Sequence, residues 1–242
     1  MKYTIIIPTL NEEKLLPAIL KQLNDKSLRN KFDYEIIVSD GGSSDKTAEI
    51  AINNSDIFIL NNKKGKQNIA SGRNTGAKLA SGKVLIFVNA DVWIPEINSF
   101  FSFIENNFAQ SKYLAMTCKV NIFPQEEIMY DKLFHTGFNN YFRILNSLGL
   151  GMGRGECQII KKDIFESLGG YNENLFAGED FDLFRRIRRL GKILFTPDIR
   201  VFESPRRFRK IGYTRVTSSW IKNGVSVLLR NKSLSTEWEQ VR

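Results

Sequence analysis

The sequence predicts an α/β fold with a mostly parallel central sheet and helices on both of its faces. Strand-like and helix-like patterns alternate along the first 91 residues, which is the rhythm of successive βαβ units. The run at 84–88 is apolar without interruption, as in a central strand that is covered on both sides. No internal repeat, low-complexity tract or linker breaks the chain. These observations favour a sheet that begins at the first residues and continues into the second half.

The first half divides into elements at its breaker residues. A β-branched run at 3–7 ends before Pro8, and leucines and isoleucines share one face of an expected helix at 12–23. A second strand at 34–38 runs into a glycine and serine turn that can begin a helix. The remaining expected elements are a helix at 47–52, a strand at 57–60, a Lys/Gly-rich loop at 61–66, a helix carrying Ala70, Ala77 and Ala80, and the strand at 84–88.

The second half is less regular. A strand is expected at 114–123 and a helix at 129–148, followed by a glycine-rich segment at 149–155 that predicts a mobile loop. A strand at 156–161, a short helix at 163–168 and a helix at 180–190 follow. In the last helix we expect Phe184, Ile187 and Leu190 to point inward and Arg185, Arg186, Arg188 and Arg189 to point outward.

Composition places the chain among ordinary globular proteins. It has 242 residues, 42% of them hydrophobic and 25% charged, which suits one large domain or one domain with an appendage. Cys118 and Cys157 are too few and too far apart to predict a disulfide framework or a zinc site, so a reduced, cytoplasmic setting is expected. The N-terminus enters a strand without a signal-peptide pattern, and no apolar run approaches the ~20 residues of a membrane span.

The positive charge is concentrated in the last quarter of the chain. Residues 185–242 hold 15 Lys/Arg and 4 Asp/Glu, a net charge of +11, whereas residues 1–184 hold 20 and 22, a net charge of −2. This asymmetry indicates an anionic partner such as a phosphate, a nucleic acid or an anionic membrane. A solvated basic surface without a partner is the alternative.

Polar side chains follow the expected strands of the first half. Thr9, Asn11 and Glu12 follow the first strand, Asp40 ends the second, and Asn89 and Asp91 follow the fourth. Parallel strands bring their carboxyl ends to one edge of the sheet, where ligands of α/β proteins bind. Asp91 there could hold a divalent cation or could only cap a following helix near residue 93, and this segment alone favours neither.

Six motifs in order resemble family 2 glycosyltransferases. They cover roughly residues 3–200 and run IIIPTLNE, IVSDGGSSD, GRNTGA with ASGK, NAD, GGYNE and GEDFDL. The resemblance implies a GT-A fold, and the residues beyond it predict a C-terminal basic helical extension. It also implies transfer of one sugar from a nucleoside-diphosphate donor to an acceptor hydroxyl, with inversion at the anomeric carbon. The processive Gln-x-x-Arg-Trp pattern is absent, so one sugar per encounter is expected.

The resemblance also implies roles for residues that match these motifs. Residues Pro8, Thr9, Glu12 and Asp40 would hold the donor nucleoside, and Arg73 would lie near the base or the diphosphate. Asn11 and Gly42 are also expected to bind the donor. The triplet Asn89-Ala90-Asp91 takes the place of an Asp-x-Asp motif, with Asp91 as ligand of Mn²⁺ or Mg²⁺. Since Asn89 replaces the first carboxylate, the triplet alone cannot provide two-carboxylate metal binding, and metal affinity without nucleotide is expected to be low.

Acidic residues at 179 and 180 are the candidates for the acceptor side. The resemblance favours Asp180 as general base and Glu179 as the residue that orients the acceptor. Acidic residues in a first helical turn can also simply complement the helix dipole. A basic residue on a C-terminal loop is expected over the diphosphate, and either Arg206 or Arg207 fits that role.

The expected organisation is a catalytic domain at 1–204 and a basic loop and helix at 205–242. Within the domain, 1–91 would be the nucleotide-binding half and 92–204 the acceptor-side half. Apolar residues at near-helical spacing in 213–228 predict a helix that packs on the core or a second subunit. A peripheral membrane contact through 206–232 at the inner face stays open as the alternative.

The expected partners are a UDP- or GDP-sugar and a carbohydrate or lipid-linked acceptor, without nucleic acid; a homodimer stays open. A polyprenyl-phosphate acceptor is the alternative within this family. A sugar-1-phosphate nucleotidyltransferase would need a glycine-rich basic loop after the first strand, where Thr9 to Glu12 stand instead. A non-catalytic nucleotide-binding protein would leave the acidic pair at 179 and 180 without a purpose. His135, the one histidine, is expected to be a helix residue without a catalytic role.

Overall fold

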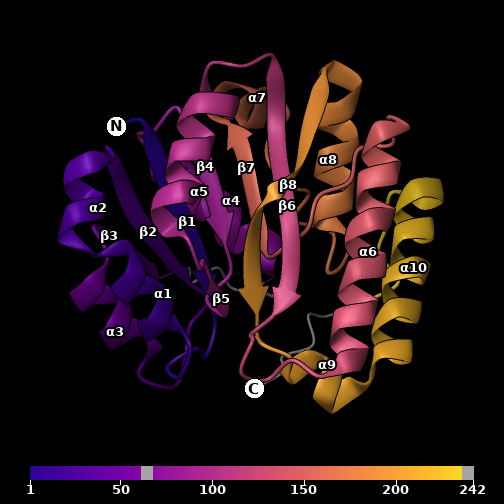
Figure 1. Ribbon diagram of the computed structural model, residues 1–242, viewed down its shortest axis with the longest axis horizontal. Helices are drawn as coiled ribbons and strands as arrows, with labels where there is room; N and C mark the ends of the chain where they lie inside the picture. Colours follow the sequence, from indigo (N-terminus) through magenta and orange to yellow (C-terminus); the bar gives the residue numbers. More distant parts are fainter. Residues whose placement is uncertain (61–67, 236–242) are drawn as a thin grey trace.

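A single eight-stranded sheet forms the centre of the protein (Figure 1). The computed structural model describes residues 1–60 and 68–235. The strand order is β3-β2-β1-β4-β7-β6-β8-β5, so the first four strands of the chain make one half of the sheet. The strands are β1 (Tyr3–Thr9), β2 (Tyr34–Asp40), β3 (Ile57–Leu60), β4 (Val84–Val88), β5 (Val92–Trp93), β6 (Tyr113–Ile122), β7 (Cys157–Lys161) and β8 (Lys192–Glu203).

The predicted α/β class with a mostly parallel sheet is confirmed. β3, β2, β1 and β4 pair in parallel, as do β6 and β8. β7 lies antiparallel between β4 and β6, and the short β5 runs antiparallel to β8. The carboxyl ends of β1, β2 and β4 therefore meet at one edge, as the polar residues after these strands predicted.

Helices cover both faces of the sheet. One core combines β1 and β2 side chains such as Tyr3 and Ile36 with helices α1, α3 and α5, and the opposite core, around Phe87, includes α4, α7 and α8. The bounds are α1 (Leu16–Leu23), α2 (Lys26–Lys31), α3 (Thr47–Asn54), α4 (Ile69–Leu79), α5 (Ile97–Phe103), the π-helix η1 (Ile104–Ala109), α6 (Met129–Ser147), α7 (Lys162–Ser167), α8 (Glu179–Leu190), α9 (Arg206–Ile211) and α10 (Tyr213–Arg230).

Glycine lets α4 lie directly on the sheet. A Cβ atom at Gly76 would lie 2.6 Å from Cγ2 of Ile6, which real side chains do not tolerate. The close approach of α4 to β1 brings Arg73, one turn earlier on the same helix, beneath the edge where the strands end. The helix therefore positions a charged side chain as well as covering the sheet.

Several expected boundaries were wrong for local reasons. The helix expected at 12–23 begins only at Leu16, and α2 was not expected, although Asp25 caps it by accepting from the Leu28 amide. β1 continues through Pro8, because its pairing with β4 stops at Ile6 and no amide is needed there.

Two further expectations differ from the structure. Leu190 was expected to point inward but is 56% exposed. Gly191 takes the packing position instead, since a Cβ there would lie 2.7 Å from Leu114 Cδ1. Asp91 does not cap a helix, because β5 follows it and α5 begins at Ile97 with Glu96 at its N-cap. The loop expected at 61–66 lies outside the described residues.

The glycine-rich segment at 149–155 is a loop, as expected, but its glycines serve close packing. A Cβ at Gly153 would lie 2.5 Å from the ring of Phe184 on α8. Arg154 in the same segment is buried. The loop is thus pressed against α8 and leads directly into β7.

Candidate active site

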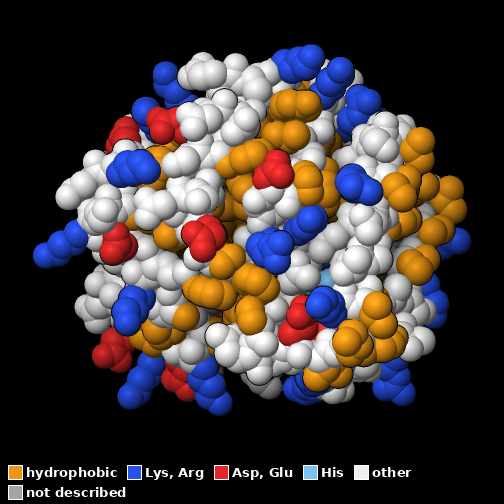
Figure 2. All heavy atoms as spheres, viewed as in Figure 1, with side chains coloured by type: hydrophobic (Ala, Val, Ile, Leu, Met, Phe, Trp, Pro, Cys, Tyr) orange, Lys and Arg blue, Asp and Glu red, His pale blue; other side chains and the backbone are white. Residues whose placement is uncertain are grey.

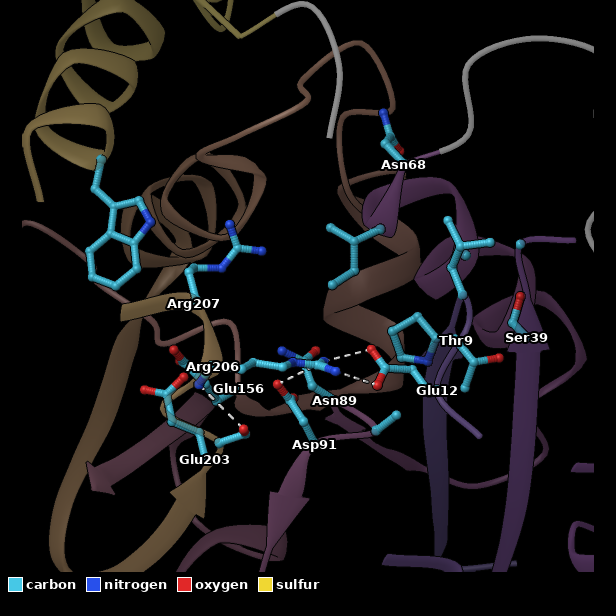
Figure 3. A pocket seen from close by; sticks show the side chains of 18 residues that line it. Thr9, Glu12, Ser39, Asn68, Asn89, Asp91, Glu156, Glu203, Arg206 and Arg207 are labelled. Atoms are coloured by element: carbon cyan, nitrogen blue, oxygen red, sulfur yellow. Dashed lines mark hydrogen bonds and ion pairs between the residues drawn. The ribbon is translucent and has the colours of Figure 1, made fainter. Parts of the chain in front are cut away.

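An open cavity lies beyond the ends of β1, β2 and β4 (Figure 3). β8 and α9 close it on the opposite side, and Trp220 of α10 contributes to the wall. The residues expected at the donor site that line this cavity are Pro8, Thr9, Glu12, Asn89, Ala90, Asp91, Arg206 and Arg207. The structure thus brings residues from both ends of the chain to one edge of the sheet.

Arg206 spans the cavity between two carboxylates. Its Nη1 and Nη2 donate to the two Glu12 carboxylate oxygens at 2.8 and 2.7 Å, and Nη2 also donates to Asp91 Oδ2 at 3.1 Å (Figure 3). Arg207 lines the same cavity. The sequence left the choice between the two arginines open, and Arg206 is the one held in the centre by acidic residues that follow β1 and β4.

Asp40 shapes the loop after β2 rather than lining the cavity. It accepts from the Thr9 hydroxyl at 2.9 Å and from the Gly42 amide at 3.0 Å. Asn11, at φ +54°, accepts from the Ser44 amide at 2.8 Å and so joins the loops after β1 and β2. Asn11, Asp40 and Gly42 therefore form the frame behind Thr9.

Ser39 was missed by the sequence analysis. Its side chain lines the cavity, is 1% exposed, and its hydroxyl oxygen has no hydrogen-bond partner among the described residues. A buried hydroxyl at the end of β2 is ready to bond to a bound molecule. Its position directly before Asp40 was the available signal.

Arg73 lies beneath the cavity and joins three segments. Its side chain is 1% exposed. Nη1 donates to Glu179 Oε1 at 3.0 Å, and Nη2 donates to Asn89 Oδ1 at 3.1 Å and to the Gly155 carbonyl at 2.6 Å. Arg73 does not line the cavity, so its contacts point to positioning of Asn89 and Glu179.

Asp180 stands at the start of α8, in the first turn. Partial burial and the adjacent Glu179 raise the pKa of Asp180 to about 7. Its Oδ1 accepts from the Phe181 amide at 2.7 Å. A Cβ at Gly155 would lie 3.3 Å from Asp180 Oδ2, so glycine there leaves the carboxyl accessible. Glu179 and Asp180 lie outside the lining of the cavity, with Arg73 linking Glu179 to it.

An acidic cluster on the β8 side of the cavity was also missed. Glu156 and Glu203 line the cavity, and Arg154 Nη2 donates to both at 3.0 and 3.1 Å. Burial and the charge of Glu156 hold the pKa of Glu203 well above its usual range, and the Asp91 charge adds to this effect. Arg154 has the opposite effect on Glu156 and lowers its pKa. The raised pKa of Glu203 favours its protonated form, in a corner with more carboxyl groups than cations.

The donor set fits one divalent cation incompletely. Among the described residues, 1–60 and 68–235, no three His, Cys, Asp or Glu side chains are arranged to hold a metal ion. Asp91 and Glu203 are carboxyl groups on the same cavity, and β5–β8 pairing places Val92 opposite Glu203. Oxygen donors of this kind suit Mn²⁺ or Mg²⁺, and a bound cation would offset the excess of acidic groups over basic ones.

His135 lies behind the acidic cluster, with its Nδ1 4.0 Å from Glu203 Oε1, and Cys157 directly follows Glu156. His135 is buried on α6, where burial lowers its pKa to about 4 and Nδ1 lies 3.2 Å from the Val120 carbonyl oxygen. Cys118 and Cys157 are buried free thiols.

The family model for glycosyl transferase family 2 matches residues 4–169, more than half of the chain. The chain belongs to glycosyl transferase family 2. The matched segment contains β1, β2, β4 and β7, and with them the floor of the cavity. The resemblance stated from the motifs is therefore confirmed.

Named relatives are distant. The chain is 27% identical over 239 residues to 4,4'-diaponeurosporenoate glycosyltransferase of Staphylococcus haemolyticus, covering 91% of this chain and 60% of the relative. It therefore spans only part of that protein's length.

Solved structures confirm the GT-A fold. The mannosyltransferase PcManGT from Pyrobaculum calidifontis, in complex with GDP-Man and Mn²⁺, is 20% identical with a TM-score of 0.66, covering 92% of this chain and 65% of that one. Glucosyl-3-phosphoglycerate synthase from Mycobacterium tuberculosis, in complex with Mn²⁺, UDP-glucose and phosphoglyceric acid, is 14% identical with a TM-score of 0.61, covering 94% and 78%.

Proposed function

We propose that this protein transfers one sugar from a nucleoside-diphosphate donor to an acceptor hydroxyl, with inversion at the anomeric carbon. The observation that carries the proposal is Arg206, held between Glu12 and Asp91 in a cavity at the ends of parallel strands. A guanidinium so placed can bind a diphosphate with paired hydrogen bonds. Family membership and the nucleotide sugars bound in similar structures support the same reaction.

The donor would lie along the ends of β1, β2 and β4. The nucleoside would sit against Pro8, Thr9 and Ser39, where the unpartnered Ser39 hydroxyl offers a hydrogen bond. The diphosphate would meet Arg206, with Arg207 beside it on the same wall. These fixed cations stabilise the negative charge that grows on the leaving nucleoside diphosphate.

A divalent cation would be held by Asp91 with Glu203 as the second side chain. Both carboxyls line the cavity, and burial together with the charges of Glu156 and Asp91 raises the pKa of Glu203, which a bound cation would offset. The bound ion supplies Lewis-acid stabilisation of the leaving diphosphate. Asp91, which accepts from Arg206 at 3.1 Å, would share its carboxylate between Arg206 and the cation.

Asp180 would accept the proton of the acceptor hydroxyl. The acceptor oxygen forms a bond to the anomeric carbon while the bond from that carbon to the diphosphate oxygen breaks, and the proton moves to the Asp180 carboxylate. Its pKa of about 7 suits a general base near neutral pH. Glu179, fixed by Arg73, would orient the acceptor.

A donor panel tests this function. We expect one or two of UDP-, GDP-, CDP- and dTDP-sugars with Mn²⁺ to raise the unfolding temperature, since a ligand that binds only the folded state stabilises it. The same donors should release nucleoside diphosphate when acceptor is present, and NMR of the product should show the inverted anomer. A stabilising donor that never transfers, even to water, would contradict an enzyme and indicate a binding protein.

A further inference from the structure

Helix α6 carries apolar side chains on its solvent side and polar ones inside. Leu133 is 66% exposed and Ile144 52%, whereas Asp131 and Asn139 are 0% and 5% exposed. An ordinary surface helix buries its apolar side chains, as α6 does with Phe142, so Leu133 and Ile144 belong to an additional apolar stripe that faces solvent. The other large apolar side chains exposed on α6 and the loop after it are Met129, Tyr130, Tyr141, Leu148 and Leu150.

Helix α10 adds a second apolar stripe beside the first. Ile221 is 61% exposed and Leu229 74%, while Val216 and Val227 pack inward. Contact between the two helices is direct, because the rings of Phe138 and Trp220 lie 5.4 Å apart. Figure 1 shows α6 and α10 side by side, and Figure 2 shows hydrophobic side chains gathered on that side of the molecule. We call this surface the α6–α10 face.

Positive charge surrounds the α6–α10 face. Within the segments 128–150 and 206–235, Asp131 is the one acidic residue, and it is buried in contact with Arg209. The exposed cations in these segments are Lys132, Arg143, Arg209, Lys210, Arg215, Lys222, Arg230 and Lys232. The face is thus apolar in its centre, basic at its rim and free of exposed acidic groups.

These properties favour an anionic lipid surface over a second copy of the chain. A symmetric dimer would bring the same basic rim against itself, which costs free energy through like-charge repulsion. Apolar side chains that insert beside lysines and arginines are typical of helices lying in a membrane interface. No helix among the described residues is long and apolar enough to cross a bilayer. We propose that the α6–α10 face binds the surface of anionic bilayers.

Docking in this way would set the cavity beside the membrane. Trp220 lines the cavity from the inner side of α10, and the next residue, Ile221, is exposed on the outer side. A single helix therefore forms both a wall of the cavity and part of the α6–α10 face. If the proposed transferase function holds, the acceptor is membrane-borne, and this further statement rests on that function.

Vesicle sedimentation tests the binding without any transfer assay. The protein is mixed with vesicles of phosphatidylcholine alone or with phosphatidylglycerol added. We expect binding to the anionic vesicles only, weakening as salt rises. The variant L133S/I144S/I221S/L229S should bind the anionic vesicles at least about tenfold more weakly than wild type, because its inserted apolar area is lost. The matched control I52S/L79S changes exposed residues of α3 and α4, at 59% and 54% exposure, and should bind like wild type.

A charge pair gives an independent second test. K222E/R230E should lower binding by about tenfold or more, while K26E/K78E, with the same charge change on α2 and α4, should not. Equal binding to both vesicle types, no binding by the wild type, or unchanged binding by the α6–α10 variants would overturn the proposal. A wild-type dimer that L133S/I144S/I221S/L229S converts to monomer in light scattering would also overturn it, in favour of a subunit interface.

Discussion

Arg73 donates to Glu179 across 3.0 Å, although 106 positions separate the two residues. The same guanidinium reaches Asn89 at 3.1 Å. Because position 89 offers a neutral amide oxygen instead of a carboxylate, Glu179 is the carboxylate to which Arg73 donates a hydrogen bond. Arg73 therefore connects the donor side of the site, at the end of β4, to the acidic first turn of α8.

Removing Arg73 should destabilise the fold. In R73A the buried Glu179 keeps its charge without its partner, which costs about 3–5 kcal/mol in comparable buried pairs. The free energy of unfolding in urea measures this loss. R73A/E179Q should recover part of it, since the unpaired charge is gone, whereas R200A, at an exposed position of β8, should change stability little. An R73A protein as stable as wild type would show that the pair carries no such energy.

Replacing Arg206 should weaken donor binding. The R206A variant loses the paired donors that face the cavity and leaves Glu12 and Asp91 as unopposed negative charges near the diphosphate. We expect a tenfold to hundredfold rise in the Kd of the nucleoside diphosphate, roughly 1.4–3 kcal/mol, by calorimetry. The Kd of R206K should fall between those of wild type and R206A, because a lysine cannot form both paired hydrogen bonds. Unchanged affinity in R206A would remove Arg206 from the donor site.

The metal requirement should depend on Glu203 as well as Asp91. E203Q should raise the Mn²⁺ concentration for half-maximal activity by about tenfold, and D91N should raise it further. Without nucleotide the protein should bind Mn²⁺ weakly, since Asn89 replaces a carboxylate in the triplet and Arg206 and Arg154 already donate to Asp91 and Glu203. Calorimetry that detected tight Mn²⁺ binding to the empty protein would contradict this account of the donor set.

The Asp131 cluster should make stability fall in acid. Hydrogen bonds from Arg209, the Ile128 amide and Tyr213 lower the pKa of Asp131 to about 2, against about 3.9 in an unfolded chain. The folded state then favours the ionised form, and this contribution of about 2–3 kcal/mol is present above pH 4 and lost as the pH falls through 2. Urea unfolding from pH 6 to 2 should show a smaller acid loss in D131N than in wild type. The matched variant D163N, on the exposed surface of α7, should lose stability in acid as wild type does.

The sheet and the position of the site could be predicted because their signals are local. The uninterrupted apolar run of β4 marks a central strand, and polar residues directly after β1 and β4 mark one edge. Parallel pairing then determines that Glu12 and Asp91 share a cavity. None of these steps needs knowledge of contacts between distant segments.

Contacts between distant segments account for what the sequence did not predict. Arg154 meets Glu203 only because β7 and β8 both flank β6, and this pairing leaves no periodic pattern. The burial of Asp131 on α6 could not be predicted for a similar reason. Its partners Arg209 and Tyr213 stand 78 and 82 positions later in the chain. Leu190 was expected to pack inward, but Gly191 lies against Leu114 instead. The end of a helix depends on the segments packed against it, which the local pattern does not contain.

The pH dependence of transfer should follow Asp180. Its pKa of about 7 means that the carboxyl is largely protonated below neutral pH and cannot accept the acceptor proton. We expect kcat/KM to fall about tenfold per pH unit below pH 7 and to level above it. The raised pKa also means that the folded state binds an extra proton between about pH 4 and 7. The free energy of unfolding should therefore decline as the pH rises from 4 to 7, and it should decline less in D180N.

The most direct test compares transfer and donor binding in D180N. The account predicts that transfer falls by about 10²–10⁴ while the Kd of the donor with Mn²⁺ stays within about threefold of wild type, because Asp180 lies outside the donor cavity. D163N, which alters an exposed aspartate in the first turn of α7, should change neither quantity. Near-normal turnover in D180N would contradict the assignment of Asp180 as the base.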